Sequence, residues 1–215
     1  MKHTSDYGIF INKRTSKKLA YYPVKKNANS SSKLFFLKHL GLENQFYFIE
    51  DDLPRYKHTK EMYDKYKGKN NIVGFLPSVP FKKINVDEKC CIIRDPLKRF
   101  VSSYKNRILF HKDKKFFNHN INLILEKLEN NLFENEHFLP QSYWLGKDLN
   151  YYTIIGKLPN IRSFVDQVNK FFQQEHFFPK IQTGGREFQI SLNLSQINKL
   201  KKIYADDYDL IGNLL

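Results

Sequence analysis

The chain of 215 residues has few cysteines, a deficit of acidic residues and no long apolar run. Its two cysteines, Cys90 and Cys91, are adjacent in an apolar stretch, where neighbouring side chains of a strand point to opposite faces. That geometry disfavours a disulfide between them, so we interpret both as small buried hydrophobes in a reducing compartment. No segment approaches the roughly 18 apolar residues of a membrane span, and residues 1–18 lack the apolar core of a secretory signal. The sequence therefore predicts a soluble, cytoplasmic protein with no transmembrane segment.

Lysine and arginine total 36 against 22 acidic residues, which gives a net charge of +14. A charge of this size indicates an anionic partner: nucleic acid, an anionic membrane, a polyanionic glycan or a nucleotide. Hydrophobic residues at 41% and aromatic residues at 15% are enough for a sizeable core, which argues against disorder. The length suits one domain, which we expect over residues 19–215 after an N-terminal extension over residues 1–18.

Short apolar runs rich in β-branched and aromatic residues alternate with helical patterns along the chain. The predicted strands are Leu19–Val24, Gln45–Glu50, Ile72–Leu76, Lys89–Ile93 and Tyr151–Ile155. Helical spacing starts near Leu34 and Leu97 and recurs over Ile121–Leu128, Ile161–Phe172 and Ile197–Leu210. This alternation is typical of an α/β domain with a mostly parallel central sheet of about four to five strands, flanked by helices. Ligands of such folds lie at the carboxyl ends of the strands.

The stretch YYPVKKNANSSSKLFF, Tyr21–Phe36, joins a predicted strand to a predicted helix. Two lysines, an Asn-Ala-Asn bend and three serines lie between them. A strand–loop–helix turn of this composition is typical of phosphate binding, because N–H groups of the first helical turn face the anion. Asparagine tolerates the left-handed backbone angles of such a bend, and we expect Ser30 to cap the helix. The Gly-x-x-x-x-Gly-Lys-Ser/Thr pattern of ordinary P-loop nucleoside triphosphatases is absent.

A second candidate phosphate site lies in CCIIRDPLKRFVSSYKNRI, Cys90–Ile108. A buried strand is predicted to end before Arg94, with Asp95 as the cap of the next helix and Pro96 at its first position. Ser102 then lies about two turns into that helix. In the 22 residues that begin at Arg94, eight basic residues outnumber two aspartates. A guanidinium offers two parallel N–H donors to a phosphate, and a nearby hydroxyl adds a third.

The pattern Arg-Asp-Pro-x-x-Arg-x-x-Ser-x-Tyr over residues 94–104 resembles a motif of sulfotransferases that use 3′-phosphoadenosine 5′-phosphosulfate (PAPS). It is most similar to the carbohydrate sulfotransferase branch. The resemblance implies that Arg94 and Ser102 bind the 3′-phosphate. Residues 26–31 match the family's 5′-phosphosulfate loop, Lys-x-Gly-x-Thr-Ser, imperfectly, since Ala28 replaces the glycine. The implied contacts of this loop are Lys25, Lys26, Asn27, Ala28, Asn29, Ser30 and Ser31.

Three more segments carry the resemblance to about residue 212. NEHFLPQSYWL, residues 135–145, resembles the family's His-aromatic-x-Pro-Gln segment. YYTIIGKLPNI, residues 151–161, resembles its Tyr-x-x-Ile-Gly-Lys-Leu-Glu-Asn-Leu stretch, with Pro159 in place of the glutamate. IYADDYDLIG, residues 203–212, resembles its closing helix. The resemblance implies a P-loop-like sulfotransferase domain over residues 19–215, which transfers a sulfuryl group from PAPS to a carbohydrate hydroxyl and releases adenosine 3′,5′-bisphosphate.

This reaction needs a base for the acceptor and positive charge at the leaving phosphate oxygen. We assign Lys26 to the phosphosulfate and the leaving-group charge, with Lys25 as the alternative. Histidine is the commonest base near neutral pH, and His137 is the first candidate, His58 the second and Glu136 the third. Because phosphate is already a good leaving group, no metal is required.

The stretch QTGGREF, residues 182–188, contains the only paired glycine of the chain. Other sulfotransferase branches close over the nucleotide with a basic, glycine-containing loop. Arg186 is therefore a candidate to contact the 3′-phosphate or the acceptor, and a plain surface turn is the alternative.

Two other functions stay open. One is a basic nucleic-acid-binding module, since positive charge and many aromatics suit single strands; the concentration of charge at strand-to-helix turns argues against it. The other is an inactive relative that keeps the fold as an interaction domain, for which Ala28 and Pro159 leave room. Golgi members of this branch carry an N-terminal membrane anchor that this chain lacks, which favours a bacterial enzyme. An anionic or extended glycan is the expected acceptor, with a lipid-linked sugar or a tyrosine peptide as alternatives.

Overall fold

The computed structural model describes residues 4–41, 72–80, 84–116, 119–181, 185 and 187–214. Within this part of the chain one sheet is formed by β1 (Thr4–Ile11), β2 (Lys18–Tyr22), β3 (Ile72–Pro80), β4 (Glu88–Arg94) and β5 (Ile154–Leu158). The strands lie in the order β3-β1-β2-β4-β5, with β2, β4 and β5 in parallel and β1 antiparallel to both of its neighbours. Since β3 is antiparallel to β1, it runs in the same direction as β2. The predicted α/β fold with a mostly parallel sheet is confirmed.

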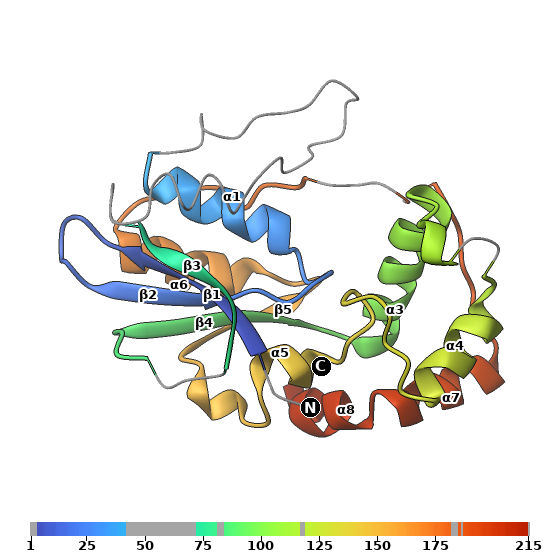
Figure 1. Ribbon diagram of the computed structural model, residues 1–215. Helices are drawn as coiled ribbons and strands as arrows, with labels where there is room; N and C mark the ends of the chain where they lie inside the picture. The colour runs from blue at the N-terminus through green and yellow to red at the C-terminus, as the bar shows by residue number, and fades with distance from the viewer. Residues whose placement is uncertain are drawn as a thin grey trace.

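Helices lie on both faces of the sheet and beyond one end of it (Figure 1). In chain order they are α1 (Asn29–His39), α3 (Pro96–Tyr104), α4 (Ile121–Glu129), α5 (Gln141–Leu145), α6 (Arg162–Phe172), α7 (Leu194–Ile203) and α8 (Ala205–Ile211). A π-helical turn, Lys105–Phe110, continues α3 directly. No helix in the described part of the chain is both long and apolar enough to cross a membrane.

Alternation along the strands divides the core between the two faces of the sheet. On one face Phe36 of α1 and Phe164 of α6 belong to the same buried cluster as Cys90. On the other face Trp144 of α5 belongs to the same cluster as Cys91. The adjacent cysteines are thus buried, free and on opposite faces, as their position in a strand predicts.

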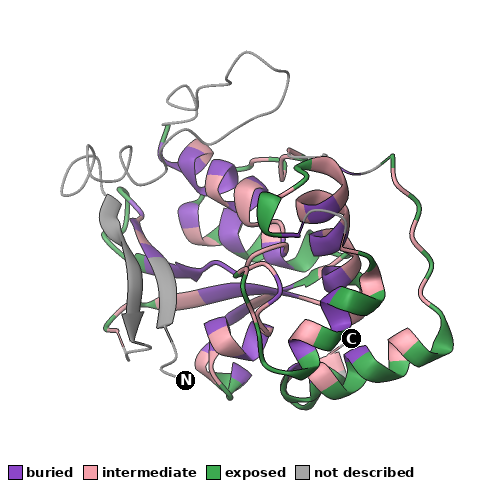
Figure 2. Ribbon diagram, turned by 45° about the vertical axis from the view of Figure 1, so that its right-hand side comes forward, coloured by how far each residue is buried: buried purple, intermediate pink, exposed green. Residues whose placement is uncertain are grey.

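A third buried cluster joins α3, α4 and α7 beyond the carboxyl end of β4. Phe100 of α3, Leu125 of α4 and Leu200 of α7 belong to it. The outer surface of α7 is exposed, whereas buried residues gather where helices pack on the sheet (Figure 2). This cluster supports α3, the helix that carries Ser102, away from the main sheet.

Several elements differ from the sequence-based expectation. β1 lies within residues 1–18, the expected extension, and pairs with β2 from Gly8 to Ile11, so these residues form part of the sheet. The helix expected over Ile197–Leu210 is two helices, α7 and α8, which meet at the buried Tyr204. Two successive helices can share one three-and-four rhythm, so periodicity does not reveal the break. The strand predicted at Gln45–Glu50 lies outside the described residues.

Candidate active site

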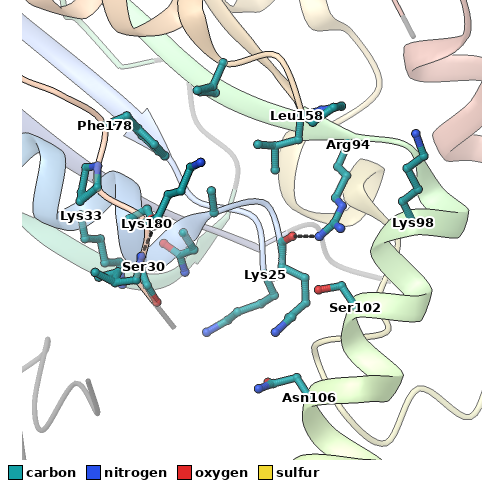
Figure 3. A pocket seen from close by; sticks show the side chains of 18 of the residues that line it. Lys25, Ser30, Lys33, Arg94, Lys98, Ser102, Asn106, Leu158, Phe178 and Lys180 are labelled. Atoms are coloured by element: carbon teal, nitrogen blue, oxygen red, sulfur yellow. Dashed lines mark hydrogen bonds between the residues drawn. The ribbon is translucent and has the colours of Figure 1, made fainter. Parts of the chain in front are cut away.

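A cavity of about 580 Å³ lies at the carboxyl ends of β2, β4 and β5 (Figure 3). Its walls come from the β2–α1 loop, α3, the β5–α6 connection and the segment 178–181. Among the described residues that line it, none is acidic and six are basic: Lys25, Lys26, Lys33, Arg94, Lys98 and Lys180. Leu158, Pro159, Ile161, Phe178, Pro179 and Ile181 add an apolar wall. The cavity therefore suits an anion that also carries an apolar part.

The β2–α1 loop turns at Lys26 and Ala28, which have positive φ angles of 67° and 55°. The neighbouring asparagines were expected to adopt these left-handed angles, but they do not. Asn27 is buried and donates from Nδ2 to the Ile92 carbonyl at 2.8 Å and to Gln141 Oε1 at 2.6 Å. Its side chain ties the loop to β4, and the turn falls on its two neighbours.

The expectation that Ser30 caps α1 was wrong. The cap position is Ala28, which makes no side-chain cap bond, and Ser30 is already the second residue of the helix. Ser32 donates back to the Ala28 carbonyl at 3.0 Å. The first helical turn still begins at the cavity, because Asn29, Ser30 and Ser31 line it. The N–H groups of such a turn have no partner within the helix and can bind an anion.

Two arginines donate hydrogen bonds to backbone carbonyl groups of the loop. Arg94 donates from Nη1 to the Lys26 carbonyl at 3.0 Å, and Arg99 donates from Nε to the Lys25 carbonyl at 2.9 Å. Arg99 is fully buried, whereas Arg94 lines the cavity with Ser102. A guanidinium has five N–H groups, so the bond to Lys26 leaves Arg94 donors for a ligand.

The expected caps of α3 are confirmed, and they explain where Ser102 lies. Asp95 accepts a hydrogen bond of 2.8 Å from the N–H of Lys98, and Pro96 occupies the first turn. The helix therefore starts directly after Arg94. Ser102, two turns later, lies with Arg94 on the cavity wall (Figure 3).

A buried polar network fixes the end of β4. Gln141 accepts from the Arg94 N–H at 3.0 Å with Oε1 and donates from Nε2 to the Arg94 carbonyl at 2.8 Å. Asp207 of α8 in turn accepts from the N–H groups of Gln141 and Ser142, each at 2.8 Å. Burial raises the pKa of Asp207, and the nearby Arg99 opposes that shift. Sequence reasoning missed Asp207, because an aspartate in an acidic helical turn resembles a surface residue.

Lys26 and His137 carry strongly shifted pKa values. Burial, followed by the charges of Arg94, Arg107 and Arg99, lowers the pKa of Lys26 to about 8. Burial also lowers the pKa of His137 to about 3, and the surrounding cations contribute to this shift. His137 is therefore neutral at pH 7. Perturbed groups of this kind in a cavity are typical of functional sites.

The structure brings most of the predicted residues to one place. Lys25, Lys26, Ala28, Asn29, Ser30, Ser31, Arg94, Ser102 and His137 all line the cavity. Asn27 does not, since it is buried beneath the loop. Glu136 forms an ion pair with Lys25 at 2.9 Å. His58 and Arg186 lie outside the described residues.

Gly185 has a φ of 87°, and a Cβ atom there would approach the Lys105 carbonyl to 3.0 Å, so this turn packs closely on the π-helical turn.

The sequence did not reveal the part of the cavity formed by Lys33, Lys180 and Phe178. Lys33 lies two residues beyond Ser31, the last residue of the predicted loop, and a search along α1 for further cations would have found it. Lys180 and Phe178 lie in a segment without helix or strand, far from every motif. Among the described residues, no group of three or more acidic, histidine or cysteine side chains could hold a metal ion.

A basic strand–loop–helix cavity at the carboxyl ends of a mostly parallel sheet defines a P-loop-like α/β protein. Residues 8–212 match the model of the sulfotransferase family, and the chain belongs to that family. Membership supports a transferase that moves a sulfuryl group. Comparison with characterised proteins found no significant match, and comparison with solved structures found none either.

Proposed function

We propose that the protein transfers a sulfuryl group from PAPS to a hydroxyl group of a carbohydrate, either a polysaccharide or a glycan precursor. One observation carries the proposal: Arg94 and Ser102, which match the family's 3′-phosphate motif, line the same cavity as the loop of Lys26. A ligand with two phosphate positions on one nucleoside fits that arrangement.

The cavity also fits the rest of the donor. Its volume of about 580 Å³ is within the usual range for sites of small organic ligands. Leu158, Ile161 and Phe178 offer apolar surface for an adenine ring, and the basic residues flank that surface. The donor would supply an activated sulfuryl group whose transfer leaves adenosine 3′,5′-bisphosphate.

The roles of the loop residues follow from their charge and position. Lys26 and the first turn of α1 would bind the 5′-phosphate side of the donor and stabilise negative charge on its bridging oxygen. Lys25 lies nearby but is already paired with Glu136. Lys26 is therefore the better candidate for this charge.

His137 is the proposed base. It is neutral at pH 7 and lines the cavity, whereas Glu136 is engaged with Lys25. Removing the proton of an acceptor hydroxyl needs an unprotonated ring nitrogen. His137 meets that condition.

The acceptor class is inferred from charge outside the donor cavity. Lys112, Lys114 and Lys115 are exposed in the turn that follows the helix of Ser102. An exposed cationic segment that follows a helix of the cavity favours an anionic or extended glycan as the acceptor. The cytoplasm of a bacterium is the proposed setting.

Calorimetric titration with adenosine 3′,5′-bisphosphate and with 5′-AMP tests the proposal. We expect the bisphosphate to bind much more tightly, and the preference to disappear in Arg94→Ala. Arg162→Ala is a matched control, because Arg162 is exposed on α6 and does not line the cavity. Equal affinity for the two nucleotides in the wild-type protein would overturn the assignment of the donor. Salt-dependent binding of single-stranded nucleic acid in that case would favour the nucleic-acid-binding alternative.

A further inference from the structure

A chain of hydrogen bonds leads from the π-helical turn to the ring of His137. Arg107 donates from Nη2 to Asp113 Oδ2 at 2.8 Å, and Asn135 donates from Nδ2 to the same oxygen at 3.1 Å. Asn135 Oδ1 then lies 2.7 Å from His137 Nδ1. Three segments of the chain thus meet at one edge of the imidazole.

The direction of this chain is determined by its two ends. Arg107 is a permanent cation, and its hydrogen bond is the main reason that the pKa of Asp113 is lowered. Asp113 is therefore ionised and can only accept, so the Asn135 nitrogen must point toward it. The Asn135 oxygen points the other way, where it also accepts from the backbone N–H of His137 at 2.9 Å.

The orientation of Asn135 decides which nitrogen of His137 holds the proton. An amide oxygen has no hydrogen to donate, so the bond of 2.7 Å requires a proton on Nδ1. In a neutral imidazole the other nitrogen, Nε2, then carries a lone pair. His137 lines the cavity, and Nδ1 is occupied by Asn135, so Nε2 is the nitrogen available to a ligand.

We propose that Asn135, oriented by Asp113 and Arg107, is a positioning residue that holds His137 as the Nδ1–H tautomer with Nε2 free to accept a proton from the acceptor. The catalytic part of this proposal rests on the proposed function, whereas the tautomer does not. In the reaction the acceptor O–H bond breaks and its proton moves to Nε2. The acceptor oxygen bonds to sulfur, the bond from sulfur to the bridging oxygen breaks, and its electron pair stays on the 5′-phosphate.

The positive charges around His137 make its affinity for a proton depend on whether the donor is bound. Arg107, Lys25, Lys26 and Arg99 all oppose protonation of the ring. A polyanionic donor offsets those charges, so the affinity of Nε2 for a proton rises when the donor is bound. The base would then become effective only in the complex.

The Asn135 side chain binds the N–H of His137, but the carbonyl side of the same segment is held by donors other than Asn135. Ser103 donates from its hydroxyl to the His137 carbonyl at 2.7 Å, and Tyr204 donates to the Phe138 carbonyl at 2.7 Å. Both donors are buried. Replacing the Asn135 side chain should therefore release the ring while the segment stays in place.

The tautomer can be measured without any reaction. In protein labelled with ¹⁵N-histidine at pH 7, two-bond proton–nitrogen correlation spectra distinguish protonated from unprotonated ring nitrogens, and His137→Gln assigns the signals. We expect protonated Nδ1 and unprotonated Nε2 in the wild type and a shift toward Nε2–H in Asn135→Leu. Asn150→Leu, at an exposed asparagine outside the cavity, should leave the signals unchanged. Nε2–H in the wild type, or unchanged signals in Asn135→Leu, would overturn the proposal.

Kinetics test the catalytic part. Partners that orient metal-bound histidines contribute about 10- to 100-fold to activity, and we expect kcat of Asn135→Leu to fall by a similar factor. Affinity for adenosine 3′,5′-bisphosphate should stay within about twofold, because Asn135 does not line the donor cavity. An unchanged kcat with an altered tautomer would contradict the positioning role. Absence of bisphosphate binding in the wild type would instead contradict the proposed function.

A double variant separates positioning from a merely structural effect. Asn135→Asp combined with Asp113→Asn exchanges the carboxylate and the amide, so that one acceptor still contacts Nδ1–H and the net charge is unchanged. A carboxylate directly on the ring raises the pKa of His137. We expect kcat to recover relative to Asn135→Leu, and the acidic limb of the pH–rate profile to move to higher pH. Recovery without that movement would contradict the proposed role of position 135.

Discussion

The Arg94 guanidinium donates from Nη1 to the Lys26 carbonyl at 3.0 Å, although the two residues are 68 positions apart. This contact joins the two predicted phosphate-binding segments into one site. Arg94 thus stabilises the conformation of the loop, and the two also line the cavity together. Replacing it should affect both ends of a bound nucleotide, so Ser102 is the sharper probe of the 3′-phosphate.

Ser102→Ala should weaken binding of adenosine 3′,5′-bisphosphate and leave binding of 5′-AMP unchanged. A hydrogen bond to a charged group contributes about 1.5–3 kcal/mol, which corresponds to about a 10- to 150-fold loss of affinity. Calorimetry measures both ligands. Ser163→Ala, at an exposed serine of α6, is the control. An equal loss for both nucleotides would place Ser102 away from the 3′-phosphate.

Bisphosphate binding should weaken above about pH 8, where free Lys26 loses its proton. Burial and nearby arginines lower the pKa of this lysine, and a bound anion raises it again, so the complex prefers protonated Lys26. Titrations from pH 7.5 to 9.5 should show a falling affinity in the wild type. Lys26→Arg, which keeps its charge over this range, should give a flat profile. A similar decline in Lys26→Arg would assign the effect to another group.

Asn27→Ala should destabilise the protein even if no ligand is present. The buried amide donates to both the Ile92 carbonyl and Gln141, and its loss leaves two buried acceptors without that donor. Each such loss costs about 1–3 kcal/mol, so we expect a total of about 2–6 kcal/mol in urea unfolding. Asn150→Ala, at an exposed site, should change stability by less than about 0.5 kcal/mol. Equal stability of the two variants would contradict a structural role for Asn27.

Acid should destabilise the fold in part through His39. This residue is 4% exposed and stacks on Phe172, and burial lowers its pKa to about 3, with a smaller effect from His176. The unfolded value is about 6.5, so between these values the unfolded chain binds more protons and stability falls as the pH falls.

His39→Phe should reduce this sensitivity to acid. Between pH 6.5 and 5 the contribution of one such histidine is about 1–2 kcal/mol. Urea unfolding at pH 7.5 and at pH 5 measures the difference in each protein. His111→Phe, at an exposed histidine, is the control. If His39→Phe and the wild type lost equal stability, the acid sensitivity would belong to other groups, among them the half-buried His137.

The sequence predicted the elements with strong local patterns. β2 and β4 are buried apolar runs, and Asp95 and Pro96 mark the start of α3 by their own chemistry. β1 was missed because it lies in a polar N-terminal stretch, and α5 because five residues are too few to show a helical period. Contacts with distant segments determine both elements, through pairing with β2 for β1 and through core packing for α5.

The residues of the site can likewise be divided into those that the sequence indicated and those that it did not. The spacing of Lys26, Arg94 and Ser102 made them candidates before the structure showed that they line one cavity, because phosphate binding at strand-to-helix turns depends on a few local residues. Phe178 and Lys180 could not be recognised, since their segment reaches the cavity only through packing against α1. The proposed positioning of His137 depends on the contact between Asn135 and Asp113, and local sequence carries no signal of that contact.

By itself the sequence determined the class of fold, the family resemblance and the two basic strand-to-helix turns, because these features depend on residue order within single segments. Only the tertiary structure decided that the two turns line one cavity, that Asn27 forms buried hydrogen bonds beneath the loop and that Asn135 contacts Nδ1 of His137. Those outcomes depend on hydrogen bonds between distant segments, which burial makes obligatory and which local sequence does not encode.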